Sequence, residues 1–141
     1  MKKLISKIYI GLSLSISAGA SAGEFAVIAH ESATVDEVSS DVIARMMLRK
    51  TSQWPDGTKV MPVDQLASSE TRETFSKEML GKTMNAVHAY WQQQVFAGRG
   101  LPPPTRESDA EVVAYVAATP GALGYVSAGA DTTNTKRIPI E

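Results

Sequence analysis

The stretch Thr119-Pro-Gly-Ala-Leu-Gly-Tyr-Val126 joins the end of a predicted helix to the start of a predicted strand. Proline cannot continue a helix and glycine accepts left-handed backbone angles, so Thr119-Pro-Gly121 should stop the helix. Leu123–Val126 is apolar and favours a strand. Ahead of both, Ser108-Asp-Ala-Glu111 has the pattern of a capping box, which places the start of the helix there. The stretch therefore predicts a helix that ends directly before a buried strand.

Further elements follow from the same rules on either side of this stretch. Expected strands are Glu24–His30, Lys59–Val63 and Lys136–Ile140, and expected helices cover about Ser40–Leu48, Glu70–Leu80 and Met84–Phe96. Serine or threonine can cap each helix start, and Gly81 and Gly98 can end two of them. Strands that alternate with helices predict an α/β fold with a small mixed, largely parallel sheet flanked by helices.

The first residues have the pattern of an export signal. Met1–Lys3 is positively charged, Ile8–Ser17 is apolar, and Ala20-Ser-Ala22 fits a cleavage site. A membrane anchor is the alternative, but the apolar run is shorter than the roughly 20 residues that span a bilayer. We therefore expect a signal peptide at residues 1–22 and a periplasmic domain at residues 23–141, with no membrane span after cleavage.

Composition argues against several classes of function. Lys and Arg total 14 against 15 Asp and Glu, without a basic cluster, so nucleic acid is not an expected partner. There is no cysteine, and His30 and His88 lie far apart in the chain, so no metal site is expected. Neither a phosphate-binding glycine motif nor a nucleophile with its base is recognisable. We expect neither a cofactor nor an enzyme.

Two tryptophans are candidates for a binding surface. Trp91 shares a helical stripe with Val87 and Val95, which predicts a place in the core for all three. Trp54 belongs to the predicted turn Trp54-Pro-Asp-Gly57, where either packing or contact with a partner is consistent with the sequence.

Several of these segments together resemble the phosphate-binding proteins of bacterial phosphate ABC transporters. The resemblance covers Val38–Leu48, Trp54–Gly57, Val60–Val63, a serine-rich helix start, and above all Thr119–Val126, which matches the family's T-P-G-A-I-G-Y-V almost letter for letter. It implies a type II periplasmic binding-protein fold. Residues 23–141 suffice for about one lobe of such a two-lobed protein.

The resemblance also implies where a ligand would bind. The family's R-S-D-G-S-G-T segment corresponds to the helix start before Phe75, which places Gln65 at the arginine position and Ala67 at the aspartate position. Ser68, Ser69 and Thr71 keep hydroxyls near the free amide groups of the helix start, where an oxyanion binds favourably. Arg72 would restore a positive charge if it turned toward that start. The candidate ligand-binding residues are therefore Gln65, Ser68, Ser69, Thr71 and Arg72.

Two functions remain open from the sequence. The first is a periplasmic solute-binding-like protein that captures a small oxyanion, phosphate by resemblance, for an ABC transporter or a membrane sensor. The second is a ligand-free protein-interaction domain that retains the lobe fold. The replacement of arginine and aspartate by Gln65 and Ala67 favours the second, whereas the hydroxyls of the helix start favour the first.

Overall fold

The structure is a computed structural model that describes residues 24–141, so the expected signal peptide lies outside the described residues. A four-stranded sheet, in the order β2, β5, β1 and β6, lies at its centre. These strands are Met61–Pro62 (β2), Ala122–Ser127 (β5), Phe25–His30 (β1) and Thr135–Arg137 (β6). β2 is parallel to β5, while β1 is antiparallel to both β5 and β6. The sheet is therefore mixed, with β2, β5 and β6 running in one direction, and the predicted fold class is confirmed.

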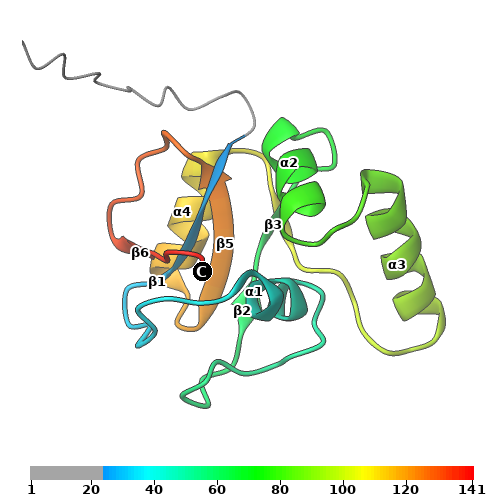
Figure 1. Cartoon of the computed structure of the whole chain (residues 1–141), viewed down its shortest axis with the longest axis horizontal. Helices are drawn as coiled ribbons and strands as arrows, with labels where there is room; N and C mark the ends of the chain where they lie inside the picture. The colour runs from blue at the N-terminus through cyan, green and yellow to red at the C-terminus, as the bar shows by residue number, and fades with distance from the viewer. Residues whose placement is uncertain (1–23) are drawn as a thin grey trace, which may run out of the picture.

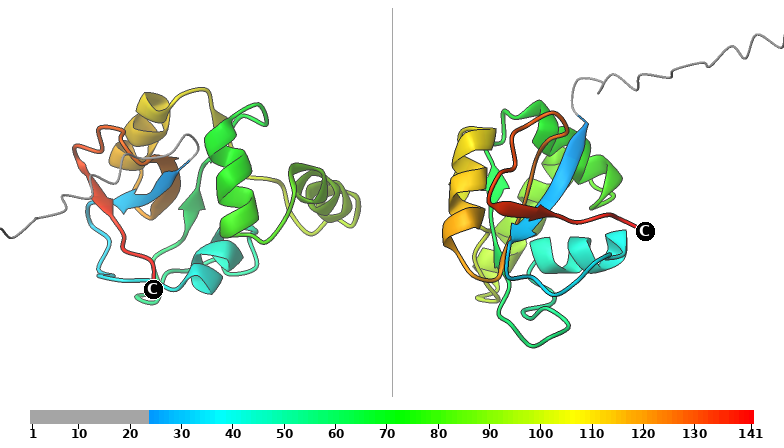
Figure 2. Two further views of the ribbon diagram at one scale, coloured as in Figure 1. Left: turned by 45° about the horizontal axis from the view of Figure 1, so that its top comes forward. Right: turned by 90° about the vertical axis from the view of Figure 1, so that its left-hand side faces the viewer.

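Helices cover both faces of this sheet, as Figure 2 shows. α4 (Asp109–Ala118) packs on one face through Val112 and Val116, beneath Ile28 of β1 and Val126 of β5. α1 (Ser40–Met47) and α2 (Glu70–Glu78) cover the other. The core on this second face includes Val27, Ala29, Leu123 and Tyr125 from the strands and Ile43, Met46 and Phe75 from the helices. Successive strand residues thus point to opposite faces, as a pleated strand requires.

The glycines of the 119–126 stretch are needed for close packing. Gly121 has a φ of +81°, and a Cβ atom there would lie 2.1 Å from the carbonyl oxygen of Lys59. A Cβ at Gly124 would lie 2.8 Å from Val63 Cγ1 and 3.1 Å from Val112 Cγ1. The pattern that most resembles phosphate-binding proteins therefore lets β5 pack closely against the chain around β2 and against α4.

The helix starts agree closely with the expectation. Ser39, Ser69, Thr83 and Ser108 cap α1, α2, α3 and α4, each accepting a hydrogen bond from a backbone N–H of the first turn. The capping box differs in one detail, because the Glu111 carboxylate accepts from the N–H of Glu107 instead of that of Ser108. α3 (Met84–Phe96) has the predicted bounds.

The strands differ more from the expectation. The predicted strands at residues 59–63 and 136–140 shorten to two and three residues, since Pro62 and Pro139 carry no N–H to continue a ladder. A second, parallel sheet of Asp64–Gln65 (β3) and Thr105–Arg106 (β4) was not predicted. Two-residue strands are too short to show a period in the sequence.

α3 stands apart from the sheet at one edge of the molecule (Figure 1). Val87 and Trp91 are buried, as predicted, and pack with Leu48, while Tyr90 donates a hydrogen bond to the Leu48 carbonyl at 2.8 Å. The prediction that Val95 also belongs to the core is wrong, because its exposed fraction is 49%. The core ends one turn earlier than the stripe, and Phe96, the last residue of α3, is likewise exposed.

Candidate functional site

Ser69, the N-cap of α2, has its hydrogen bonds satisfied within the turn that contains it. Its hydroxyl accepts from the backbone N–H of Arg72 at 3.1 Å and donates to the side-chain carbonyl of Gln65. The amides of Glu70 and Thr71, in the first turn, have no acceptor inside the helix. The capping hydroxyl, by contrast, already has both a donor and an acceptor.

Arg72 turns back beneath the helix start. Its Nη1 donates to the backbone carbonyl of Gln65 at 2.8 Å, and its Nε lies 3.5 Å from Asp64 Oδ1. The positive charge of Arg72, one of the predicted ligand-binding groups, is thus directed to the buried carboxylate of Asp64 and not to the helix start. Arg72 supports the turn from behind.

Gln65 and Thr71 connect this turn to β5 and α4. The Gln65 amide donates to the Tyr125 carbonyl at 3.0 Å and to Asp109 Oδ1 at 3.3 Å. The Thr71 hydroxyl lies 3.1 Å from that of Ser127, whose backbone N–H also donates to Asp109 Oδ1. Both Gln65 and Thr71 are buried. These bonds therefore connect the segment around the start of α2 to the start of α4 and to the end of β5.

An open groove of 370 Å³ lies where these two helix starts meet. From the turn it is lined by Gln65, Leu66, Ser68, Ser69 and Thr71, and from the opposite side by Glu107, Ser108, Asp109 and Ser127. Four of the five predicted residues thus come together, and Arg72 is the one outside the lining. Asp109, Ser108 and Ser127 were missed because their proximity depends on hydrogen bonds between segments far apart in the chain, which bring the turn before α2 to the start of α4 and the end of β5, although the capping box had located the start of α4.

The electrostatics of the groove are mixed. Two helix starts bring partial positive charge, whereas Glu107 and Asp109 bring negative charge. A doubly charged anion is repelled by these carboxylates. A partly protonated anion can instead donate a hydrogen bond to one of them. Asp109, which lines the groove, is one carboxylate that can accept such a hydrogen bond.

Behind the turn, Tyr125 donates its hydroxyl to Asp64. Burial, together with the neighbouring Asp64 carboxylate, raises the pKa of Tyr125 well above its ordinary value. Asp64 also accepts from the Gln65 N–H at 2.8 Å. The neutral phenol and this carboxylate thus fix the strand that leads into the turn.

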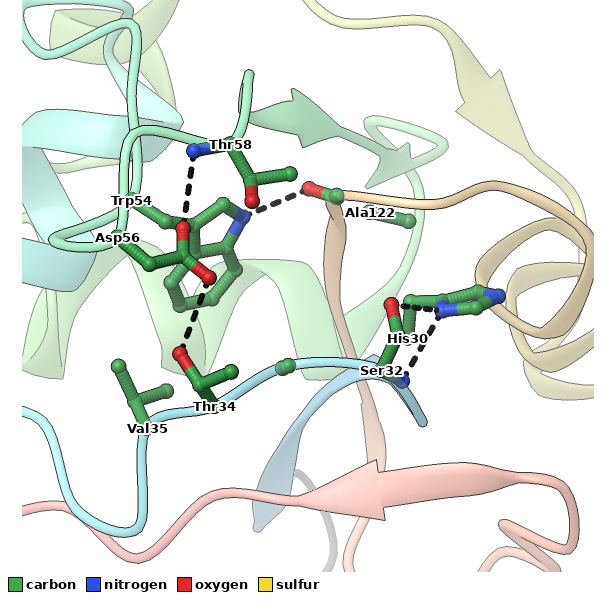
Figure 3. A pocket seen from close by; sticks show the side chains of 10 residues that line it. His30, Ser32, Thr34, Val35, Trp54, Asp56, Thr58 and Ala122 are labelled. Carbon is green, nitrogen blue, oxygen red and sulfur yellow. Dashed lines mark hydrogen bonds between the residues drawn. The ribbon is translucent and has the colours of Figure 1, made fainter.

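A second, small cavity lies beside Trp54 (Figure 3). Trp54 is 5% exposed and donates its indole N–H to the Gly121 carbonyl at 2.9 Å. Asp56 accepts from the Thr34 hydroxyl and the Thr58 N–H, and the latter bond is the main cause that lowers the pKa of Asp56. The cavity measures 20 Å³, enough for about one water molecule. Trp54 therefore packs inside the molecule, and the partner-contact interpretation does not hold.

Among residues 24–141, none of the helices combines the length and the hydrophobicity that crossing a bilayer requires.

Comparison with solved structures identifies the fold. An ABC-type phosphate transport receptor from Vibrio cholerae superimposes with a TM-score of 0.65 at 16% identity, over 83% of this chain and 46% of the receptor. A putative phosphate ABC transporter substrate-binding protein from Clostridium perfringens, with bound phosphate, gives a TM-score of 0.63 at 17% identity, over 83% of this chain and 44% of that protein. The chain has the fold of phosphate substrate-binding proteins.

The likeness extends over most of this chain but over only part of each solved structure. A possible phosphate-binding protein from Planctomyces limnophilus is matched over 84% of this chain but 41% of its own length, at a TM-score of 0.62 and 16% identity. The chain thus spans less than half the length of these substrate-binding proteins, which agrees with a single lobe of their fold. No protein-family model and no curated protein matches the sequence.

Proposed function

We propose that this chain is a periplasmic solute-binding-like protein that captures a small oxyanion, phosphate by resemblance, in the groove between the starts of α2 and α4. One observation carries the proposal: two helix starts and the hydroxyls of Ser68, Ser69 and Thr71 meet at one groove. The fold is that of substrate-binding proteins, one of which contains phosphate. An ABC transporter or a membrane sensor is the proposed partner that receives the ligand.

The groove determines which form of the ligand binds. The first turn of α2 leaves the N–H groups of Glu70 and Thr71 without an acceptor inside the helix, and the groove lining adds the Ser68 hydroxyl and the Asp109 carboxylate. This set suits an oxyanion that retains a proton. Phosphate binding should therefore strengthen as the pH falls from 8 to 6, because the monoanion then replaces the dianion. Sulfate has no proton in this range and should bind more weakly.

We expect low affinity for the isolated chain. A two-lobed binding protein surrounds its ligand, whereas an open groove leaves one side of the ligand in water. Binding then stabilises the fold only when the ligand concentration exceeds the dissociation constant. A second wall, from another copy or from the transporter, would increase the affinity.

Thermal denaturation in a phosphate series tests the proposal. The melting temperature should rise saturably with millimolar phosphate at pH 6 and less with sulfate at equal ionic strength. Thr71→Val should abolish the rise, because the groove loses a hydroxyl while the side-chain volume is kept. Equal shifts with phosphate, sulfate and chloride would indicate a salt effect and contradict the proposal. A flat series would also contradict it and would leave the ligand-free interaction domain as the account.

A further inference from the structure

Arg72, which lies outside the lining of the groove, lines a separate cleft. This cleft has a volume of 390 Å³ and is formed by α2, α3 and the segment that leads into β4. It shares no lining residue with the groove. A volume of this size accommodates a small organic ligand.

The floor of this cleft is an ion pair with unused hydrogen-bonding capacity. Arg72 and Asp64 side chains are 12% and 10% exposed. Within the described residues, Arg72 Nε is the one buried side-chain nitrogen or oxygen that lacks a hydrogen bond. In the same part of the chain, Arg72 Nη2 and Asp64 Oδ2 have no hydrogen-bond partner either, and neither is sealed from solvent. A largely buried pair with free donors and a free acceptor destabilises the fold unless something else binds it.

The walls of the cleft are mostly apolar. Met84, Trp91, Pro102 and Pro103 form them, and the exposed Asn85 and His88 stand at the mouth. Asn85 and His88 come from the first half of α3, which Thr83 caps. An apolar enclosure with a few convergent polar groups is the usual composition of a small-molecule site.

The charges of the floor select the chemistry of the ligand. Arg72 and Asp64 carry opposite charges, so the floor has no net charge, and a simple anion gains from one group what it loses to the other. A zwitterion satisfies both, because its carboxylate can accept from Arg72 Nη2 while its ammonium donates to Asp64 Oδ2. The apolar walls then hold a hydrophobic substituent.

We propose that this cleft binds a small zwitterion with an apolar substituent, the chemistry of a hydrophobic α-amino acid. This site is independent of the oxyanion groove. The proposal for one site can therefore hold when the proposal for the other fails.

Calorimetric titration of the full chain with L-phenylalanine tests the proposal, alongside two analogues that each lack one charge, 3-phenylpropionate and phenethylamine. We expect saturable binding of L-phenylalanine and at least about tenfold weaker binding of either analogue, since each loses one charge-assisted hydrogen bond. Absence of binding, or equal binding of 3-phenylpropionate, would overturn the proposal.

Variants locate the site. Asn85→Trp places a large side chain at the mouth from an exposed position, so the fold should persist while L-phenylalanine binding is lost. Arg72→Met should also abolish binding, with circular dichroism checking that the protein is still folded. Ser69→Ala, in the oxyanion groove, is the matched control and should bind L-phenylalanine as the unmodified chain does. Binding that survives Asn85→Trp, or that is lost in Ser69→Ala, would refute this location.

Discussion

The stretch Thr119–Val126 and the turn Gln65–Arg72 both belong to the resemblance with phosphate-binding proteins, but they differ in what their residues do. In the first, glycines and Tyr125 are enclosed by Lys59, Val63 and Asp64. In the second, side chains line an open groove, and the Gln65 amide donates a hydrogen bond across it to Asp109. The stretch that keeps the family pattern is scaffold, and the turn that departs from it is the candidate site. A fold can therefore be retained while its binding chemistry changes.

The largest expected effect comes from Gly121 in the scaffold. Gly121→Ala combines a positive φ with a Cβ that would overlap the Lys59 carbonyl, a backbone atom that cannot move aside. We expect a loss of about 3 kcal/mol or more in the free energy of unfolding, measured by urea denaturation. Gly129→Ala is the matched control, since its Cβ would meet nothing within 4 Å. Equal stability of the two variants would contradict the packing account.

Gly124→Ala tests the same scaffold from the other face of β5. The new Cβ would crowd Val63 and Val112, whose side chains can shift by a few tenths of an ångström. The expected loss is about 1 to 3 kcal/mol. Adding Val63→Ala removes the closest contact, so the double variant should be less destabilised than the sum of the two single variants. Strict additivity would show that the two sites do not touch.

Tyr125 connects the two regions and makes the free energy of unfolding depend on pH in the alkaline range. Its pKa is raised in the folded chain, so the folded state keeps the phenol proton at pH values where the unfolded state has released it. Stability should therefore fall as the pH rises above about 10, the ordinary pKa of tyrosine. Tyr125→Phe should be less stable near neutral pH, by about 1 to 2 kcal/mol, with a shallower alkaline decline. Melting curves between pH 8 and 11 compare this variant with the unmodified chain. If the stability of both declined in parallel, Tyr125 would not be the source of the pH dependence.

Ser69 should have the smallest effect on stability. Ser69→Ala removes an N-cap and should cost about 1 kcal/mol. Thr83→Ala removes the corresponding cap of α3 at a distance from the groove and should cost a similar amount. Phosphate stabilisation should weaken in the first variant and remain in the second. If phosphate raised the stability of both variants equally, Ser69 and its turn would have no part in phosphate binding.

The sequence predicts the scaffold better than the site, for a physical reason. Caps, glycine stops and alternating apolar residues are local, so Ser69, Thr83 and Gly81 mark helix ends correctly and β1 and β5 are recognisable. The groove depends on contacts between residues about 40 apart, such as Gln65 with Asp109, and no local pattern encodes them. The same limit explains why the direction of Arg72 and the exposure of Val95 became clear from the structure.

Backbone amide chemical shifts in a phosphate titration at pH 6 test the central claim most directly. If the starts of α2 and α4 hold the anion, the N–H signals of Glu70, Thr71, Asp109 and Ala110 should move together and saturate at one dissociation constant. Shifts that never saturate, or that are confined to residues near lysines outside the groove, would contradict oxyanion capture at this site.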